Sequence, residues 1–336
     1  MLCLRQQIES ALTVIGAVVG AGFASGREVY HFFSRYGVNG LASVLVAMVI
    51  LCLLCTRVLV LTRRYRARTL AELMQRHLGV GVNRLLTLVI LCALWLGLGI
   101  MMSGAGAAGE SLGVNRLITL AVTASLVAIC LGSGISGIKK ANAVLMPILI
   151  AVSSYLFWCG QKHGSYSFLI EDARASSWAG SVWSAILYAG LNSLLLFVVI
   201  PPLAVGGKQA GIIVGCIIFG MMLFCTTFLL LQYPALSAES PVPMLSIASD
   251  VAPRVPGIYG VILWTALTTT ALANGLGLHP FVDTHFRLQR FQASVLVVAS
   301  PLPVALLPFA QLVSIVYTGL GYVALVLVAT MLKPSR

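Results

Sequence analysis

Residues 12–34, LTVIGAVVGAGFASGREVYHFFS, form an apolar run that is long enough to cross a bilayer but is interrupted by four glycines. These are Gly16, Gly20, Gly22 and Gly26. Each costs about 1 kcal/mol relative to alanine inside a helix. Arg27 and Glu28 follow directly, and a lipid-facing helix tolerates such charges poorly. We therefore predict a spanning helix that unwinds at about Gly20–Gly26 and lines a polar cavity, because irregular backbone at membrane depth must meet protein or a cavity.

The same glycines permit a simpler interpretation. Gly16-x-x-x-Gly20 and Gly22-x-x-x-Gly26 match the small-residue motifs that let two membrane helices approach closely. The adjoining charge pair, and a similar interruption in the second half of the chain, favour the broken helix.

The composition identifies an integral membrane protein. Of the 336 residues, 59% are hydrophobic and 9% are charged, whereas a soluble domain carries roughly 25% charged residues. The net charge of +12 does not indicate nucleic acid as a partner, because the basic residues lie in short loops between apolar runs. The period-two alternation of an outer-membrane barrel is absent from the sequence.

The apolar runs predict ten transmembrane helices. Their ranges are 8–34, 39–61, 83–108, 116–135, 142–159, 181–203, 210–232, 255–277, 291–308 and 311–331. Most of the 21 Lys and Arg residues then fall on the side of the N-terminus, which places both termini in the cytoplasm. We expect a multi-pass protein of a bacterial cytoplasmic membrane, with anionic lipids contacting its basic cytoplasmic face. The sequence does not define an oligomeric state.

The predicted loop 161–180 divides the chain into two groups of five helices, at 1–160 and 181–336. An odd number of helices per half gives the halves opposite orientations, as in transporters that bind solute between the discontinuous first helices of two inverted repeats. The sixth helix has a polar middle at Tyr188, Gly190 and Asn192. We therefore predict that helices 1 and 6 are both discontinuous.

A broken helix offers amide N–H groups to an anion and carbonyl groups to a cation. The candidate solute-binding residues lie at the two predicted breaks and on the third helix; Ser103, on the third helix, has packing as its alternative role. They are Gly20, Ala21, Gly22, Ser25, Gly26, Ser103, Tyr188, Gly190 and Asn192. Glu28, with Arg27 and His31, is a candidate gate or coupling group that could carry a proton, and a structural salt bridge is the alternative.

A second group of oxygen atoms lies on the eighth helix. Ala266, Thr269 and Thr270 share one helix face at i, i+3 and i+4, and the carbonyls of Gly16 and Val19 could complete a site for a small hard cation. The alternative is that the threonines bond carbonyls of their own helix. The spans contain no catalytic motif, so we expect neither an enzyme nor an organic cofactor.

Residues 15–28, IGAVVGAGFASGRE, resemble the start of the YkvI-like membrane proteins. That family is placed in the amino acid–polyamine–organocation superfamily, whose members have the LeuT fold of five plus five inverted helices. The resemblance implies that Gly16, Val19, Ala266, Thr269 and Thr270 hold a sodium ion. Some proton-coupled relatives carry a lysine on helix five in place of the ion, and the predicted helix five lacks a lysine, which also favours sodium.

These features together predict a cation-coupled secondary active transporter of a small solute. Sodium is the expected cation, an amino acid the expected solute, and alternating access the expected mechanism. The alternative is a solute sensor or signalling protein with the same fold that does not translocate, and a channel comes third.

Overall fold

The computed structural model describes residues 2–67, 72–73, 80–133, 138–162, 164, 166, 177–204, 209–286 and 289–332. The described part contains helices and no strand. Much of the basic loop after the second helix, and most of the predicted linker 161–180, lie outside these residues.

In the described residues, the first half of the chain begins with a helix in three pieces, and four further helices follow. The pieces are α1 (Leu2–Val18), α2 (Ala21–Ser25) and α3 (Arg27–Phe32), with a 3₁₀ turn at Ser34–Tyr36. The helices that follow are α4 (Gly37–Tyr65), α6 (Val80–Ser111), α7 (Arg116–Ser133) and α8 (Ile138–Gly160). The predicted discontinuity of the first helix is confirmed.

The second half starts with α10 (Trp178–Ala204) and α11 (Gln209–Gln232). Two short helices, α12 (Pro234–Glu239) and α13 (Pro243–Val251), each begin at a proline, which suits the first helical position because its missing N–H has no helical partner. The remaining elements are α14 (Pro256–Phe286), α15 (Arg290–Ala299), α16 (Leu302–Ala305), α17 (Phe309–Leu312), the π-helical turn η3 (Val313–Tyr317) and α18 (Thr318–Leu332).

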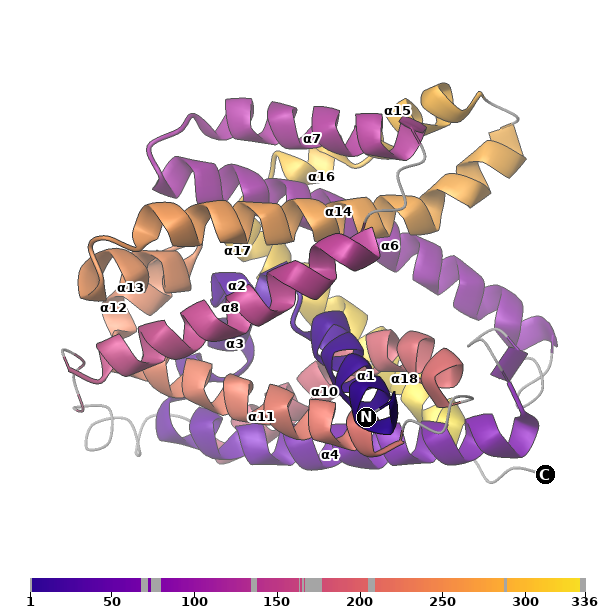
Figure 1. Cartoon of the computed structure of the whole chain (residues 1–336), viewed down its shortest axis with the longest axis horizontal. Coiled ribbons are helices and arrows are strands. Elements are labelled where there is room, and N and C mark those ends of the chain that lie inside the picture. Colours follow the sequence, from indigo (N-terminus) through magenta and orange to yellow (C-terminus); the bar gives the residue numbers. More distant parts are fainter. Residues whose placement is uncertain are drawn as a thin grey trace.

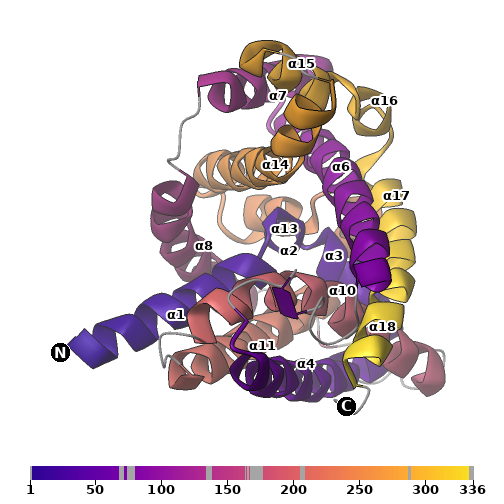
Figure 2. The same ribbon diagram turned by 90° about the vertical axis from the view of Figure 1, so that its right-hand side faces the viewer.

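Two groups of helices enclose the short pieces α2 and α3 of the broken first helix. One contains α1, α4, α10 and α11, and the other contains α6, α7, α14 and α15 (Figure 1). The short pieces α2 and α3 lie between the two groups and contact both: α2 packs on α14, and α3 packs on α10 and α11 (Figure 2). This position is the one expected for a solute site between moving helix groups.

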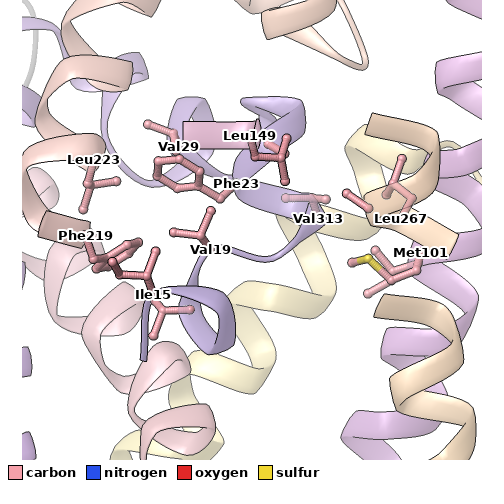
Figure 3. Packing of buried hydrophobic residues seen from close by; sticks show 14 of the residues in the cluster. Ile15, Val19, Phe23, Val29, Met101, Leu149, Phe219, Leu223, Leu267 and Val313 are labelled. Carbon is pink, nitrogen blue, oxygen red and sulfur yellow. The ribbon is translucent and has the colours of Figure 1, made fainter. Parts of the chain in front are cut away.

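The interior around the break is apolar on several sides. In Figure 3, Val19 and Phe23 lie near Phe219 of α11, and the two phenyl rings are 5.8 Å apart. Met101 and Leu267 lie together on another side of the same view. Burial of this surface fixes the short helices α2 and α3, which are too short to be stable alone.

The prediction that helix 6 is discontinuous is wrong. Helix α10 runs without interruption from Trp178 to Ala204. The Asn192 side chain donates to the Tyr188 carbonyl at 3.0 Å, and the Ser193 hydroxyl donates to the Gly190 carbonyl at 2.6 Å. The polar groups of the helix middle are therefore satisfied within the helix, as short polar side chains often are. Gly190 allows close packing on α18, where the nearest atoms are those of Leu325 and the Gly321 carbonyl.

Seven helices of the described part are long and apolar enough to cross a membrane, and two shorter apolar helices lie at Pro147–Gly160 and Arg290–Ala305. The predicted ninth span is divided into α15 and α16 close to Pro301. The all-helical membrane architecture is confirmed, while the total of ten spans and the division into inverted repeats stay predictions.

Candidate functional site

The main-chain break lies at Val19 and Gly20, at the inner end of the break predicted from the sequence. Gly20 is extended, with φ −80° and ψ 179°, and its N–H donates to the Val18 carbonyl at 2.9 Å. Open space surrounds the position that a Cβ of Gly20 would take. The first helical hydrogen bond of α2 runs from the Ala24 N–H to the Gly20 carbonyl. The N–H groups of residues 21–23 therefore have no partner within this helix.

A second change of direction occurs at Gly26. Its φ of 78° lies in the left-handed region that favours glycine, and it joins α2 to α3. A Cβ here would lie 2.7 Å from Cγ of Met244. The neighbouring Ser25 is buried and donates its hydroxyl to the Gly22 carbonyl at 2.7 Å, so this side chain supports the turn.

Beside the break, the fold brings together five residues that we call the Glu28 cluster: Gly22, Glu28, Tyr188, Asn192 and Tyr317. Glu28 is 6% exposed, and its Oε2 atom is 2.5 Å from the position that a Cβ on Gly22 would occupy. The Tyr317 hydroxyl lies 3.3 Å from the same point, and the Asn192 side chain lies beside the carboxylate. Elements from both halves of the chain thus surround a single buried acid.

Four members of the cluster are sequence-predicted site residues, whereas Tyr317 was missed. Tyr317 ends the π-helical turn η3, and such turns are frequent at functional sites. A polar aromatic side chain inside the apolar last helix was the only sequence signal, and it did not indicate that Tyr317 lies beside residue 28.

Tyr188 is held firmly but leaves its hydroxyl unsatisfied. The ring packs against Phe32, Phe33 and Phe219, with centroid distances of 5.4, 4.8 and 6.5 Å. The side chain is fully buried, and its hydroxyl has no hydrogen-bond partner among the described residues. Because buried hydroxyls are nearly always paired, this group is available to bond a solute, an ion or a water molecule.

The predicted ion pair of Glu28 with Arg27 or His31 is not formed. Adjacent residues on a helix do not face each other, and Arg27 extends away to α12. Its Nη1 atom donates to the carbonyls of Ser237, Ala238 and Ser240 at 3.4, 3.0 and 3.2 Å. The His31 ring instead bonds the Thr318 hydroxyl at 2.9 Å and accepts from Arg35 at 3.3 Å.

Replacing Arg27 by alanine is expected to release α12, because hydrogen bonds from a charged donor contribute about 1.5 kcal/mol or more. Amide hydrogen exchange over residues 234–240 should then be roughly tenfold faster. Mass spectrometry of exchanged peptides measures this directly. The matched control is Arg35→Ala, since Arg35 bonds His31 and Tyr36 rather than α12. Unchanged exchange in Arg27→Ala would show that α12 is held by other contacts.

Two predicted solute-binding residues lie away from the Glu28 cluster. The Ser103 hydroxyl donates to the Leu307 carbonyl at 2.7 Å and accepts from Arg116 at 3.3 Å, so it fixes the link between α16 and α17. Gly190 faces α18, as described above. For both residues the observed contacts are packing and backbone support.

The predicted sodium ligands on α14 bond their own helix. The hydroxyls of Thr269 and Thr270 donate to the Ala266 carbonyl at 3.0 and 2.8 Å. Both hydroxyl oxygens keep lone pairs that could coordinate a cation. The N–H of Val19 bonds the Ile15 carbonyl at 2.6 Å, which leaves the Val19 carbonyl at the break. Hydroxyl and carbonyl oxygens are suitable ligands for sodium, and the sodium site stays a prediction.

An interrupted helix and a buried polar cluster between two helix groups define a membrane protein with the architecture of a secondary transporter. Solved structures of transporters share this fold. MhsT in complex with L-phenylalanine superposes with a TM-score of 0.57 and 18% identity, over 95% of this chain and 88% of that one. A manganese transporter variant from Eremococcus coleocola superposes with a TM-score of 0.63 and 13% identity, over 97% of this chain and 77% of that one. Mhp1 is a nucleobase-cation-symport-1 family transporter, solved with bromovinylhydantoin bound. It superposes with a TM-score of 0.52 and 14% identity, over 91% of this chain and 74% of that one.

Sequence relatives agree with the resemblance of residues 15–28. The membrane protein YkvI of Bacillus subtilis is 28% identical over 338 residues, which cover 96% of this chain and 94% of YkvI. YyaD of the same organism is 22% identical over 98% of this chain and 96% of its own length. No model of a known protein family matches the chain. The similarity to YkvI and the LeuT-like fold are thereby confirmed.

Proposed function

We propose that this protein is a cation-coupled secondary active transporter of a small solute, with an amino acid as the solute and sodium as a coupling ion. The main-chain break at Val19–Gly20, beside a buried acid and between two packed helix groups, is the observation that carries the proposal. Main-chain groups at such a break can bind a zwitterion, because amides face its carboxylate and carbonyls face its ammonium group.

The transport mechanism follows from the two helix groups. Rocking of α1, α4, α10 and α11 against α6, α7, α14 and α15 would expose the break to each side of the membrane in turn. The hydrogen bonds from Arg27 to α12 would close one end of the bundle during this cycle. The solved neighbours are transporters rather than enzymes, and one of them holds an amino acid, which supports the proposal.

Sodium coupling is tested in proteoliposomes loaded to give an inward sodium gradient. We expect the gradient to stimulate uptake of radiolabelled protein amino acids, and the double variant Thr269→Ala, Thr270→Ala to reduce this stimulation by about tenfold or more, through loss of two cation ligands. Thr265→Ala is the matched control, since the Thr265 hydroxyl bonds the Val261 carbonyl and not the Ala266 carbonyl.

The outcomes of this experiment separate the candidate functions. Solute binding in a thermal-shift assay without accumulation in proteoliposomes would identify a sensor. A current that needs no bound solute would identify a channel. Full sodium stimulation in the double variant would remove the threonine pair from the coupling mechanism.

A further inference from the structure

Glu28 lies buried without a positive partner in the described part of the chain. The carboxylate is 6% exposed, while Arg27 bonds α12 and His31 bonds Thr318 and Arg35. An ionised carboxylate removed from water is very costly unless it is paired and hydrogen-bonded. The site therefore requires a positive charge that the surrounding side chains do not supply.

The elements packed on α3 confirm this shortage of positive charge. Helix α10 contributes Tyr188 and η3 contributes Tyr317, both phenols. The only titratable side chains of α11 are cysteines, and α12 carries one further acid, Glu239. The 3₁₀ turn contributes Tyr36 and Arg35, and the Arg35 guanidinium bonds Tyr36 at 2.6 Å and His31 at 3.3 Å. These described elements therefore place no positive charge on the Glu28 carboxylate, and a bound species can neutralise it.

The space around the carboxylate selects a small species. The Oε2 atom and the Tyr317 hydroxyl lie 2.5 and 3.3 Å from the point where even a methyl group on Gly22 would stand. A solute ammonium group, or a metal ion with its ligand shell, would have to displace these groups. A proton adds no volume and converts the acid to its neutral form.

We propose that Glu28 binds a proton that is transported together with the solute, at a site separate from the predicted sodium ligands. This inference rests on the proposed transport function and adds a second coupling ion to it. The carboxylate of Glu28 covers Gly22, next to the amides that would bind the carboxylate of an amino acid. Two like charges this close repel strongly in a poorly solvated site, so the solute binds when Glu28 is neutral.

The unpaired Tyr188 hydroxyl fits the same role. It is fully buried, lies near Glu28 and Asn192, and makes no hydrogen bond of good geometry within the described residues. A hydroxyl can donate to the carboxylate when the proton leaves. It thus offers the ionised acid a hydrogen bond during the part of the cycle in which the proton is absent.

The protonation of Glu28 can be measured without knowing the solute. Infrared difference spectra of the reconstituted protein, recorded across a pH titration, should contain the carbonyl-stretching band of a buried, protonated carboxyl group. This band should disappear in Glu28→Gln and persist in Glu110→Gln, which alters an exposed acid on α6. Absence of any band that depends on Glu28, at every pH tested, would overturn the proposal.

Coupling is tested with the same variants in proteoliposomes that carry an inward proton gradient. Uptake of radiolabelled protein amino acids should rise with the gradient in the unmodified protein and in Glu110→Gln. Uptake by Glu28→Gln should no longer respond to the gradient, although thermal unfolding is unchanged. An undiminished response in Glu28→Gln would refute the coupling role. Absence of uptake in the unmodified protein under every gradient would refute the proposed transport function, while the infrared titration still decides whether Glu28 binds a proton.

Discussion

Replacing Gly22 by alanine is expected to reduce solute uptake by about tenfold or more, equivalent to roughly 1.4 kcal/mol of lost binding or barrier lowering. The added Cβ would stand 2.5 Å from Oε2 of Glu28 and 3.3 Å from the Tyr317 hydroxyl. The Glu28 side chain must then move out of the cluster, and the main chain at the break loses access to the solute. Because a side chain rather than backbone is displaced, the protein should still fold.

Uptake of radiolabelled amino acids into proteoliposomes measures this effect, and thermal unfolding measures folding. Gly319→Ala on α18 is the matched control, since no atom lies within 4 Å of the position of its Cβ. This control should transport normally. If Gly22→Ala transported as well as the control, close access to the main chain at Gly22 would not be needed for function.

Replacing Gly40 by alanine is expected to produce the largest loss of stability. Gly40 lies in the first turns of α4, and a Cβ there would stand only 1.9 Å from the carbonyl oxygen of Phe33. This oxygen is part of the backbone and cannot rotate away, so α4 must shift relative to α3. Overpacking of this kind costs about 1–3 kcal/mol.

The midpoint of thermal unfolding in detergent, followed by circular dichroism, should fall clearly in Gly40→Ala. Gly257→Ala, at the start of α14, has no atom within 4 Å of the position of its Cβ and should unfold like the unmodified protein. Equal midpoints for the two variants would show that α4 can shift at little cost and would contradict the predicted tight contact.

Local sequence determined the membrane architecture and the position of the first break. Long apolar runs predict spanning helices by composition alone, and a glycine-rich stretch followed by charges predicts a break by its low helix propensity. Both signals depend only on neighbouring residues, and the structure shows the predicted interruptions at Val19–Gly20 and at Gly26. Four of the predicted solute-binding and gate residues, Gly22, Glu28, Tyr188 and Asn192, also meet in one cluster.

Tertiary structure decided which polar groups meet beside the break. Polar residues in the middle of a helix can either accompany a break or form hydrogen bonds within the helix. In α10 the side chains of Asn192 and Ser193 bond carbonyls of their own helix, and the helix is continuous. Whether Arg27 pairs with Glu28 depended on α12, whose carbonyls lie more than two hundred positions along the chain. Tyr317, which lies even farther along the chain, approaches the same point beside Gly22 as the Glu28 carboxylate. Such contacts depend on how separate helices pack, and packing is determined by the shape of the whole bundle rather than by any one stretch of residues.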